Sequence, residues 1–175
     1  MSGEKSSAVV QQQFTEQAMR SVLGHFCSGV TVVTAMGRAG PVGFTCQAFS
    51  SLSLRPPQVL LCPSLTSTTW PAISECGRFC VNVLAESQSL LSERFAQSGG
   101  DKFHGVRWTA SSHGSPRLTG AVAWLDCEVH AEYDGGDHLI VRGDIRSLEA
   151  ASAARPLLYY RGRYSGLAEE AFGAS

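Results

Sequence analysis

Alternation of apolar and polar residues predicts that most of this chain forms strands. The clearest case is the segment 122–134, in which every second residue from Ala123 to Ala131 is apolar. The glycine pair at 135–136 follows, and a second extended segment occupies 138–148. Two such segments joined by a glycine turn are typical of a β-hairpin, so we expect them to pair antiparallel.

Other segments complete the predicted fold. Runs rich in β-branched and aromatic residues predict strands at 29–36, 44–54, 58–63, 78–84 and 156–167. Helical patterns occupy 14–26 and 86–96, and the segment 64–77 predicts hydroxyl residues followed by a short helix that ends at Gly77. Because hairpins outnumber βαβ units, we expect a mainly β fold, an antiparallel barrel that is closed or partly closed, with peripheral α-helices. The Gly- and Ser-rich segment 97–120 predicts a long loop that wraps over a site or a partner.

Composition narrows the class of protein. The 175 residues are 43% hydrophobic and 17% charged, which suits one domain at 14–167 between a flexible polar arm at 1–13 and a tail at 168–175. The net charge is −1 and there is no basic stripe, so we expect no nucleic-acid partner. No apolar run is long enough to cross a membrane, and the start lacks the apolar core of a secretion signal. We therefore expect a cytoplasmic protein without a membrane partner.

The cysteine pattern does not suggest a metal site. Cys76 and Cys80 are the only close pair among six cysteines, and no second pair completes a zinc box. In the reducing cytosol we expect free thiols rather than disulfides. Cys46, Cys62 and Cys127 stand, like Cys80, in strand-like apolar runs, so we interpret these four as small buried hydrophobic residues.

An acid and an imidazole, Asp137 and His138, stand at the mouth of a predicted strand. One interpretation is structural, because Asp is common in turns and a His at a strand edge is often a surface group. The other is catalytic, with Asp137 orienting the imidazole and determining its tautomer. No Ser in a G-x-S-x-G turn accompanies the pair, so a hydrolytic triad is disfavoured.

Three polar segments are candidates for ligand binding. Hydroxyl side chains between Thr45 and Ser53 suit a planar heterocycle, and those at 64–69 precede a predicted helix whose free amides suit a phosphate. Aromatic and cationic residues at 159–164 suit stacking on a ring and pairing with a phosphate. Each segment also has a structural interpretation, as a half-buried strand, an ordinary helix cap or an edge strand. No Walker loop or G-x-G-x-x-G is present, so a dinucleotide would bind without a Rossmann unit.

Taken in order, several segments resemble the short-chain flavin reductase family, the small components of two-component flavin-dependent monooxygenases. The likeness includes the reductase partners of actinobacterial steroid and polyketide hydroxylases. It covers about 14–167 and rests on FCSGVTVVTA, GFTCQAFSSLSLRPPQVLLCP, GRFCVNVL, ERFA, DKF, GGDHLIVRGDI and PLLYYRGRY. This resemblance implies an FMN-binding split barrel, a six-stranded antiparallel Greek-key barrel, usually in a homodimer.

The resemblance also implies which residues touch the cofactors. The flavin is expected against Pro41, Val42, Gly43, Phe44, Thr45, Gln47, Ala48, Cys62, Pro63, Ser64, Thr68, Thr69, Arg94 and Phe95. His138 matches a histidine placed at the nicotinamide, with Asp137 beside it. The pyridine nucleotide is further expected against Tyr159, Tyr160, Arg161 and Gly162. This chain departs from many relatives by Thr66-Ser67-Thr68 in place of a Lys or Arg and by Ala48 in place of Ser, so we expect modest flavin affinity.

The expected function is an NAD(P)H:flavin oxidoreductase. It would transfer a hydride from NADH to FMN or FAD and supply free reduced flavin to a separate monooxygenase. The cofactors carry this chemistry, while the protein supplies proximity and orientation. Three alternatives stay open: a non-catalytic flavin-binding barrel, an oxidase or reductase that keeps its flavin and acts on an organic substrate, and a structural protein with an aromatic face. The sequence does not distinguish FMN from FAD, or NADH from NADPH.

Overall fold

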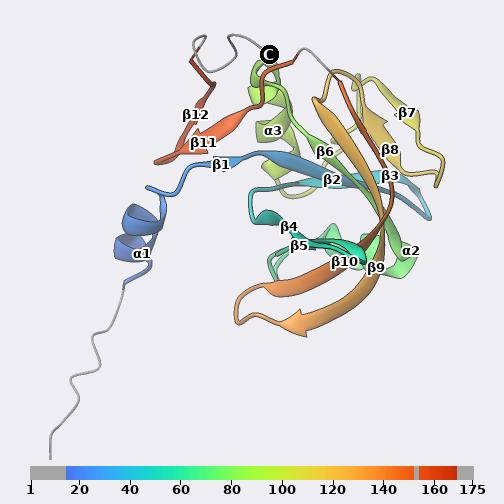
Figure 1. Ribbon diagram of the computed structural model, residues 1–175, viewed down its shortest axis with the longest axis horizontal. Helices are drawn as coiled ribbons and strands as arrows, with labels where there is room; N and C mark the ends of the chain where they lie inside the picture. The colour runs from blue at the N-terminus through green and yellow to red at the C-terminus, as the bar shows by residue number, and fades with distance from the viewer. Residues whose placement is uncertain (1–14, 152–153, 169–175) are drawn as a thin grey trace, which may run out of the picture.

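The computed structural model describes residues 15–151 and 154–168, so the predicted arm at 1–13, Phe14, and residues 169–175 of the predicted tail lie outside the described residues. Seven strands form one antiparallel sheet in the order β3-β2-β6-β9-β10-β5-β4 (Figure 1). In chain order they are β2 (Thr31–Gly37), β3 (Gly40–Cys46), β4 (Phe49–Leu54), β5 (Pro57–Leu61), β6 (Arg78–Val83), β9 (Ala123–Asp134) and β10 (Leu139–Ala150). The expected mainly β fold is confirmed. The main sheet has seven strands where six were expected, because β4 extends it beyond β5.

The sheet curls around an apolar core. Val33, Leu61, Phe79 and Val141, one from each of four strands, are fully buried. Side chains alternate between the two faces of a strand, so these residues share the inner face while their neighbours turn outward. Burial of each such side chain contributes about 1.5–3 kcal/mol to folding. The core therefore holds the strand ends in place as a rigid support for the loops.

The cysteines are free thiols, and three of them are core residues. Cys46, Cys80 and Cys127 are buried, and burial raises the pKa of each thiol, to about 12 for Cys46 and Cys127. These side chains are therefore neutral and pack as small apolar groups, which confirms the expectation for them. Cys62 differs, because it is only half-buried.

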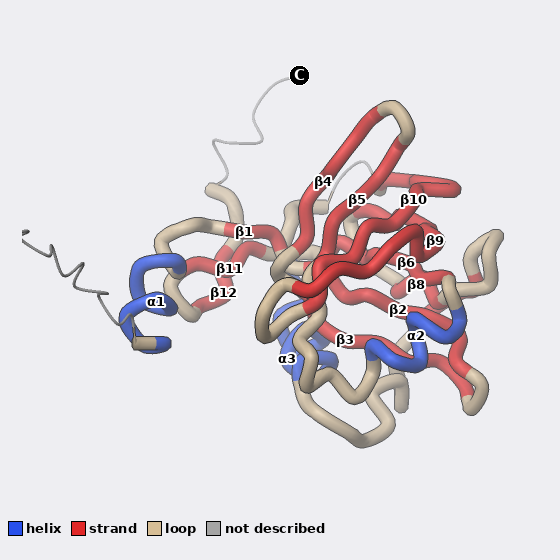
Figure 2. Tube along the Cα trace, turned by 90° about the horizontal axis from the view of Figure 1, so that it is seen from below, coloured by secondary structure: helices blue, strands red, loops and turns tan. Residues whose placement is uncertain are grey.

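The strands β3 and β4 form the two margins of the sheet. They are joined by Gln47 and Ala48, yet among the described strands β3 pairs only with β2 and β4 only with β5. Figure 2 shows the two at opposite margins of the sheet. The barrel is thus split along a line between β3 and β4, which we call the seam.

Two segments contain more strand than the sequence predicted. The expected loop at 97–120 includes a short hairpin of β7 (Trp108–Ala110) and β8 (Pro116–Leu118). The single strand expected at 156–167 is also a hairpin, β11 (Leu158–Tyr160) and β12 (Arg163–Ser165), which pairs with β1 (Ser28–Gly29). In contrast, the hairpin predicted from 122–148 is present as β9 and β10.

The helices lie at the periphery, as expected. They are α1 (Glu16–Leu23), α2 (Trp70–Cys76) and α3 (Ser89–Ala96), preceded by the 3-10 turn η1 (Glu86–Gln88). α2 ends at Gly77, whose φ of 71° is the left-handed conformation that glycine favours. α1 buries no residue, and Figures 1 and 2 both show it beside β1, β11 and β12, away from the barrel. In the described part of the chain, no helix has the length and apolarity needed to span a bilayer.

Candidate functional site

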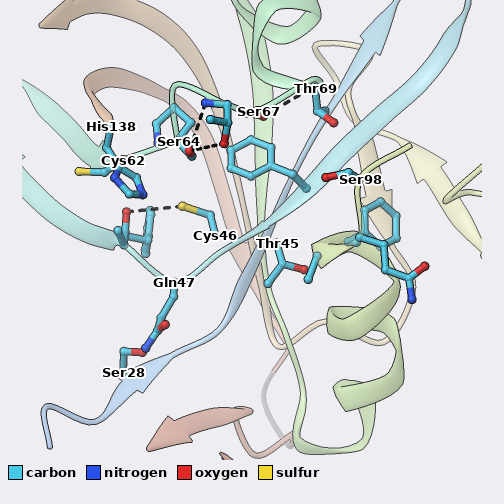
Figure 3. Close-up of a pocket in the computed structure, with 18 of the residues that line it drawn as sticks. Ser28, Thr45, Cys46, Gln47, Cys62, Ser64, Ser67, Thr69, Ser98 and His138 are labelled. Carbon is cyan, nitrogen blue, oxygen red and sulfur yellow. Dashed lines mark hydrogen bonds between the residues drawn. The ribbon is translucent and has the colours of Figure 1, made fainter. Parts of the chain in front are cut away.

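A cavity of about 790 Å³, which we call the seam cavity, opens where β3 and β4 separate (Figure 3). Its volume lies within the range of small-molecule sites. The walls come from β3, the 47–48 linker, β4, the loop after β5 and the end of α3. The lining residues are Leu23, Phe26, Ser28, Phe44, Thr45, Cys46, Gln47, Ala48, Phe49, Ser50, Leu60, Cys62, Pro63, Ser64, Thr66, Ser67, Thr68, Thr69, Phe95, Ala96, Gln97, Ser98, Lys102 and His138.

Most of the residues expected at the cofactors meet at this cavity. The structure brings together Phe44, Thr45, Gln47, Ala48, Cys62, Pro63, Ser64, Thr68, Thr69, Phe95 and His138. Pro41, Val42 and Gly43 line an adjoining cavity, whose wall also includes Thr68 and Thr69. Segments far apart in the sequence therefore converge on one place, which their individual patterns could not show.

The walls of the seam cavity suit a flat heterocycle. Phe44, Phe49 and Leu60 supply apolar surface for the faces of such a ring. Gln47, which is exposed, and the margins of the sheet supply hydrogen-bonding groups for its edge. The hydroxyl of Thr45 instead donates to the Ser92 carbonyl at 2.5 Å, so this threonine ties β3 to α3. The volume and the mixture of apolar and hydrogen-bonding groups thus fit a flavin.

His138 reaches the cavity from a constrained backbone. It forms an isolated bridge with Ser64, and the Leu139 amide donates to the Pro63 carbonyl at 2.9 Å. The imidazole Nδ1 lies 2.7 Å from Oδ1 of Asp137. An ionised carboxylate only accepts hydrogen bonds, so Nδ1 carries the proton and Nε2 is left for a ligand. This hydrogen bond, with the charge of the imidazole, lowers the pKa of the Asp137 carboxyl.

The hydroxyl-rich loop before α2 differs from its prediction in one respect. The amides of Thr69 and Trp70 both donate to the Ser67 hydroxyl, at 3.3 and 3.1 Å. These amides are therefore not free for a phosphate, and the loop faces the cavity with the side chains of Thr68 and Thr69 instead.

Arg94 and four residues expected at the pyridine nucleotide line neither of these two cavities. Arg94 is exposed and donates to the His104 carbonyl at 2.8 Å, beside a separate hollow under Leu90. Arg94 comes directly before Phe95 in α3. Consecutive helix residues point about 100° apart, so only Phe95 faces the cavity. The other four stand on the β11–β12 hairpin, and two of them line a hollow there: Tyr159, Tyr160, Arg161 and Gly162.

Lys102 is a cavity residue that the sequence reasoning missed. Its Nζ donates to the carbonyls of Gly43 at 3.3 Å and Phe95 at 3.1 Å, and burial lowers the pKa of the ammonium. The segment 97–102 thus wraps over the site, as expected of the long loop. The one available signal was the motif DKF, which contains this lysine. Leu23 and Phe26, at the end of α1, also line the cavity and were not predicted.

Known proteins resemble this chain over almost its whole length. Residues 23–168 match the family model described as flavin reductase like domain. The chain is 49% identical over 160 residues to HsaB, the reductase subunit of a flavin-dependent monooxygenase of Rhodococcus jostii, covering 91% of this chain and 82% of the relative.

Solved structures share the fold. A homologue of nitrilotriacetate monooxygenase component B from Mycobacterium thermoresistibile superposes with a TM-score of 0.86 at 46% identity, covering 91% of this chain and 90% of the other. The NADH:FAD oxidoreductase SgcE6 of Streptomyces globisporus, in complex with NAD and FAD fragments, gives a TM-score of 0.84 at 36% identity, covering 89% and 94%.

These matches extend over the elements that build the seam cavity, from the end of α1 to the last strand. The split barrel, the convergence of the expected residues and the likeness of sequence all lead to one conclusion. The chain belongs to the flavin reductase family.

Proposed function

We propose that this protein transfers a hydride from NADH to FMN or FAD and releases the reduced flavin to a separate monooxygenase. The observation that carries the proposal is the seam cavity, whose wall combines the apolar side chains of Phe44, Phe49 and Leu60 with His138, which is hydrogen-bonded to Asp137. Two similar proteins support it, since one is a monooxygenase reductase subunit and the other an NADH:FAD oxidoreductase.

A bound flavin would supply the hydride acceptor, and the residues of this chain would orient and shield it. Phe44 and Leu60 exclude water from the ring faces, while Gln47 meets the ring edge. His138 holds the nicotinamide through Nε2, because Nδ1 is engaged by Asp137. Proximity and orientation of the two rings are then the main contribution of the protein. No residue has to form a covalent bond with either cofactor.

Release of the product follows from the openness of the site. The 47–48 linker is exposed, and so is the hydroxyl of Thr66 at the opposite wall. No described residue closes the seam with a backbone ladder between β3 and β4. A flavin can therefore leave without rearrangement of the barrel, as a diffusible carrier requires.

The test is NADH consumption with added FMN or FAD, followed by absorbance. We expect turnover with wild type, and we expect His138→Ala to raise the KM for NADH or slow flavin reduction by about 10-fold, the range of one lost hydrogen bond. His113→Ala is the matched control, because His113 lies in the β7–β8 turn and lines none of the cavities described above. NADH consumption at background rate would leave only a flavin-binding barrel, and equal rates for both variants would reject the role of His138.

A second measurement separates a flavin carrier from an enzyme that keeps its flavin. We expect gel filtration after turnover to separate the flavin from the protein. Retention of stoichiometric flavin through turnover would instead favour an oxidase or reductase acting on an organic substrate.

We also propose that the protein is a cytoplasmic homodimer. Val22, Leu23 and Phe26 are 70, 64 and 80% exposed on or just after α1, and the last two also line the cavity. A second copy would cover this apolar surface and shield the cavity mouth. Sedimentation should therefore give a dimer, and Val22→Glu should give a monomer. A monomeric wild type would reject this part of the proposal. Six free thiols agree with a reducing compartment.

A further inference from the structure

A second cavity of about 570 Å³ adjoins the seam cavity. It lies between the β2–β3 turn, α2 and the segment 99–104. Apolar surface comes from Pro41, Val42 and Ala72, and polar groups come from Asp101 and His104. The mixture of apolar walls with a few polar groups is typical of sites for nucleosides and other small molecules.

The two cavities meet at three residues, since Thr68, Thr69 and Lys102 line both of them. A ligand longer than one cavity can therefore continue from the first into the second past these side chains. In Figure 3, His138 and Ser64 lie on one side of the seam cavity, while Ser98, which belongs to the loop that carries Lys102, lies on the other. Thr69, one of the shared residues, is on the side of Ser98, away from the imidazole.

Lys102 is the positive charge at this junction. Among the described residues that line the two cavities, it is the only lysine or arginine. Its two hydrogen bonds go to neutral carbonyl oxygens, and an ammonium has three donors, so one donor is available. No carboxylate of the described chain forms an ion pair with it. A half-buried cation without an anionic partner attracts phosphate groups.

We propose that the second cavity receives the adenosine diphosphate half of FAD, with Lys102 and the hydroxyls of Thr68 and Thr69 on the phosphates. This inference rests on the proposed function, which places the flavin ring in the seam cavity with its far end toward Lys102. FMN would end at the junction, and FAD would continue into the second cavity. The protein would then prefer FAD over FMN. NADH carries the same adenosine diphosphate group, so the experiment must separate the two sources.

The first arm compares riboflavin, FMN and FAD by quenching of flavin fluorescence. We expect Lys102→Met to weaken the binding of FMN and FAD by about 10-fold or more, because a charge-assisted hydrogen bond to phosphate is lost, and to leave the affinity for riboflavin unchanged. Lys102→Arg should restore most of the affinity. Arg55→Met removes an exposed cation that lines neither cavity, so it should change none of the three affinities. An equal effect of Lys102→Met on riboflavin would show a merely structural lysine and overturn its assignment.

The second arm fills the second cavity. Ala72→Trp and Ala39→Trp alter residues that line this cavity alone, so FAD should bind about 10-fold more weakly and FMN as in wild type. Two variants on separate elements guard against a folding defect in one. Unchanged FAD affinity in both variants would overturn the proposal. If they raised the KM for NADH with FMN as acceptor and left FAD affinity intact, the cavity would hold the adenosine of NADH instead. Wild type that binds no riboflavin would contradict the proposed function itself.

Discussion

Gly43 in β3 is a position where one added methyl group should disturb both the fold and the site. A Cβ atom there would lie 2.8 Å from Cε1 and 3.1 Å from Cδ1 of Phe95, and 3.0 Å from the Val33 carbonyl oxygen. Carbon atoms at van der Waals contact are about 3.5–4.0 Å apart. Phe95 is fully buried and Val33 O belongs to the paired strand β2, so neither neighbour moves away easily.

The expected magnitude follows from this crowding. Overpacking of a well-packed core costs about 1–3 kcal/mol, and we expect Gly43→Ala to lower the free energy of unfolding by that amount. The carbonyls of Gly43 and Phe95 are also the two acceptors of the Lys102 ammonium. A shift of α3 away from β3 therefore displaces Lys102, and FMN should bind more weakly in the variant.

The assay is urea denaturation followed by tryptophan fluorescence, together with flavin titration. Gly29→Ala is the matched control, because Gly29 is also a strand glycine and a Cβ there meets nothing within 4 Å. Its free energy of unfolding should stay within about 0.5 kcal/mol of wild type, the usual range for surface changes. If Gly43→Ala matched this control in stability and FMN affinity, the close packing of β3 on α3 would be important neither for folding nor for the position of Lys102.

Three other predictions concern buried groups and the site. Asn82→Leu removes the Oδ1 that accepts from the buried Leu118 amide at 2.7 Å, so the free energy of unfolding from urea curves should fall by about 1–3 kcal/mol; an unchanged value would contradict this. Burial lowers the pKa of Lys102 from 10.5, so the FMN affinity measured by calorimetry should fall as pH rises through the lowered value, while the riboflavin affinity stays constant. The free energy of unfolding should rise over the same pH range, because burial favours the neutral amine. Parallel pH curves for FMN and riboflavin would refute the role of Lys102. Asp137→Asn keeps an acceptor near His138 but removes the charge, so NADH oxidation should be slower than in wild type and faster than in His138→Ala; a rate equal to wild type would show that the charge is irrelevant.

Local patterns predicted the elements whose contacts are local. The β9–β10 hairpin combines long alternating strands with a glycine turn, and both signals lie within one short stretch of chain. The β7–β8 hairpin was missed because each strand has only three residues and no alternation can be read over so short a length. The β11–β12 turn was missed because its bend depends on Arg161 at a φ of 48°, a conformation that non-glycine residues rarely adopt.

The same distinction between local and long-range signals applies to the residues of the site. The segment from Phe44 to Ala48 could be found because it is contiguous and resembles a known family, and the structure places it in the wall of the seam cavity. Arg94 was expected there, but only the phase of α3 decides that Phe95 faces inward. Lys102 lies in an irregular segment, so neither a helical nor a strand period indicates its direction. Its place depends on the contact with the Gly43 carbonyl, 59 positions away in the chain.

The seam also bears on how this site could change during evolution. A ligand that binds along β3 and β4 meets main-chain atoms, which every amino acid except proline supplies alike. A side-chain exchange at Ala48 would leave those atoms in place, so this exposed position can vary in sequence without loss of the main-chain contacts. β3 already carries Pro41, which lines the adjoining cavity. A proline between Phe44 and Ser50, in the wall of the seam cavity, would delete an amide hydrogen there, and such replacements should be the ones that selection removes.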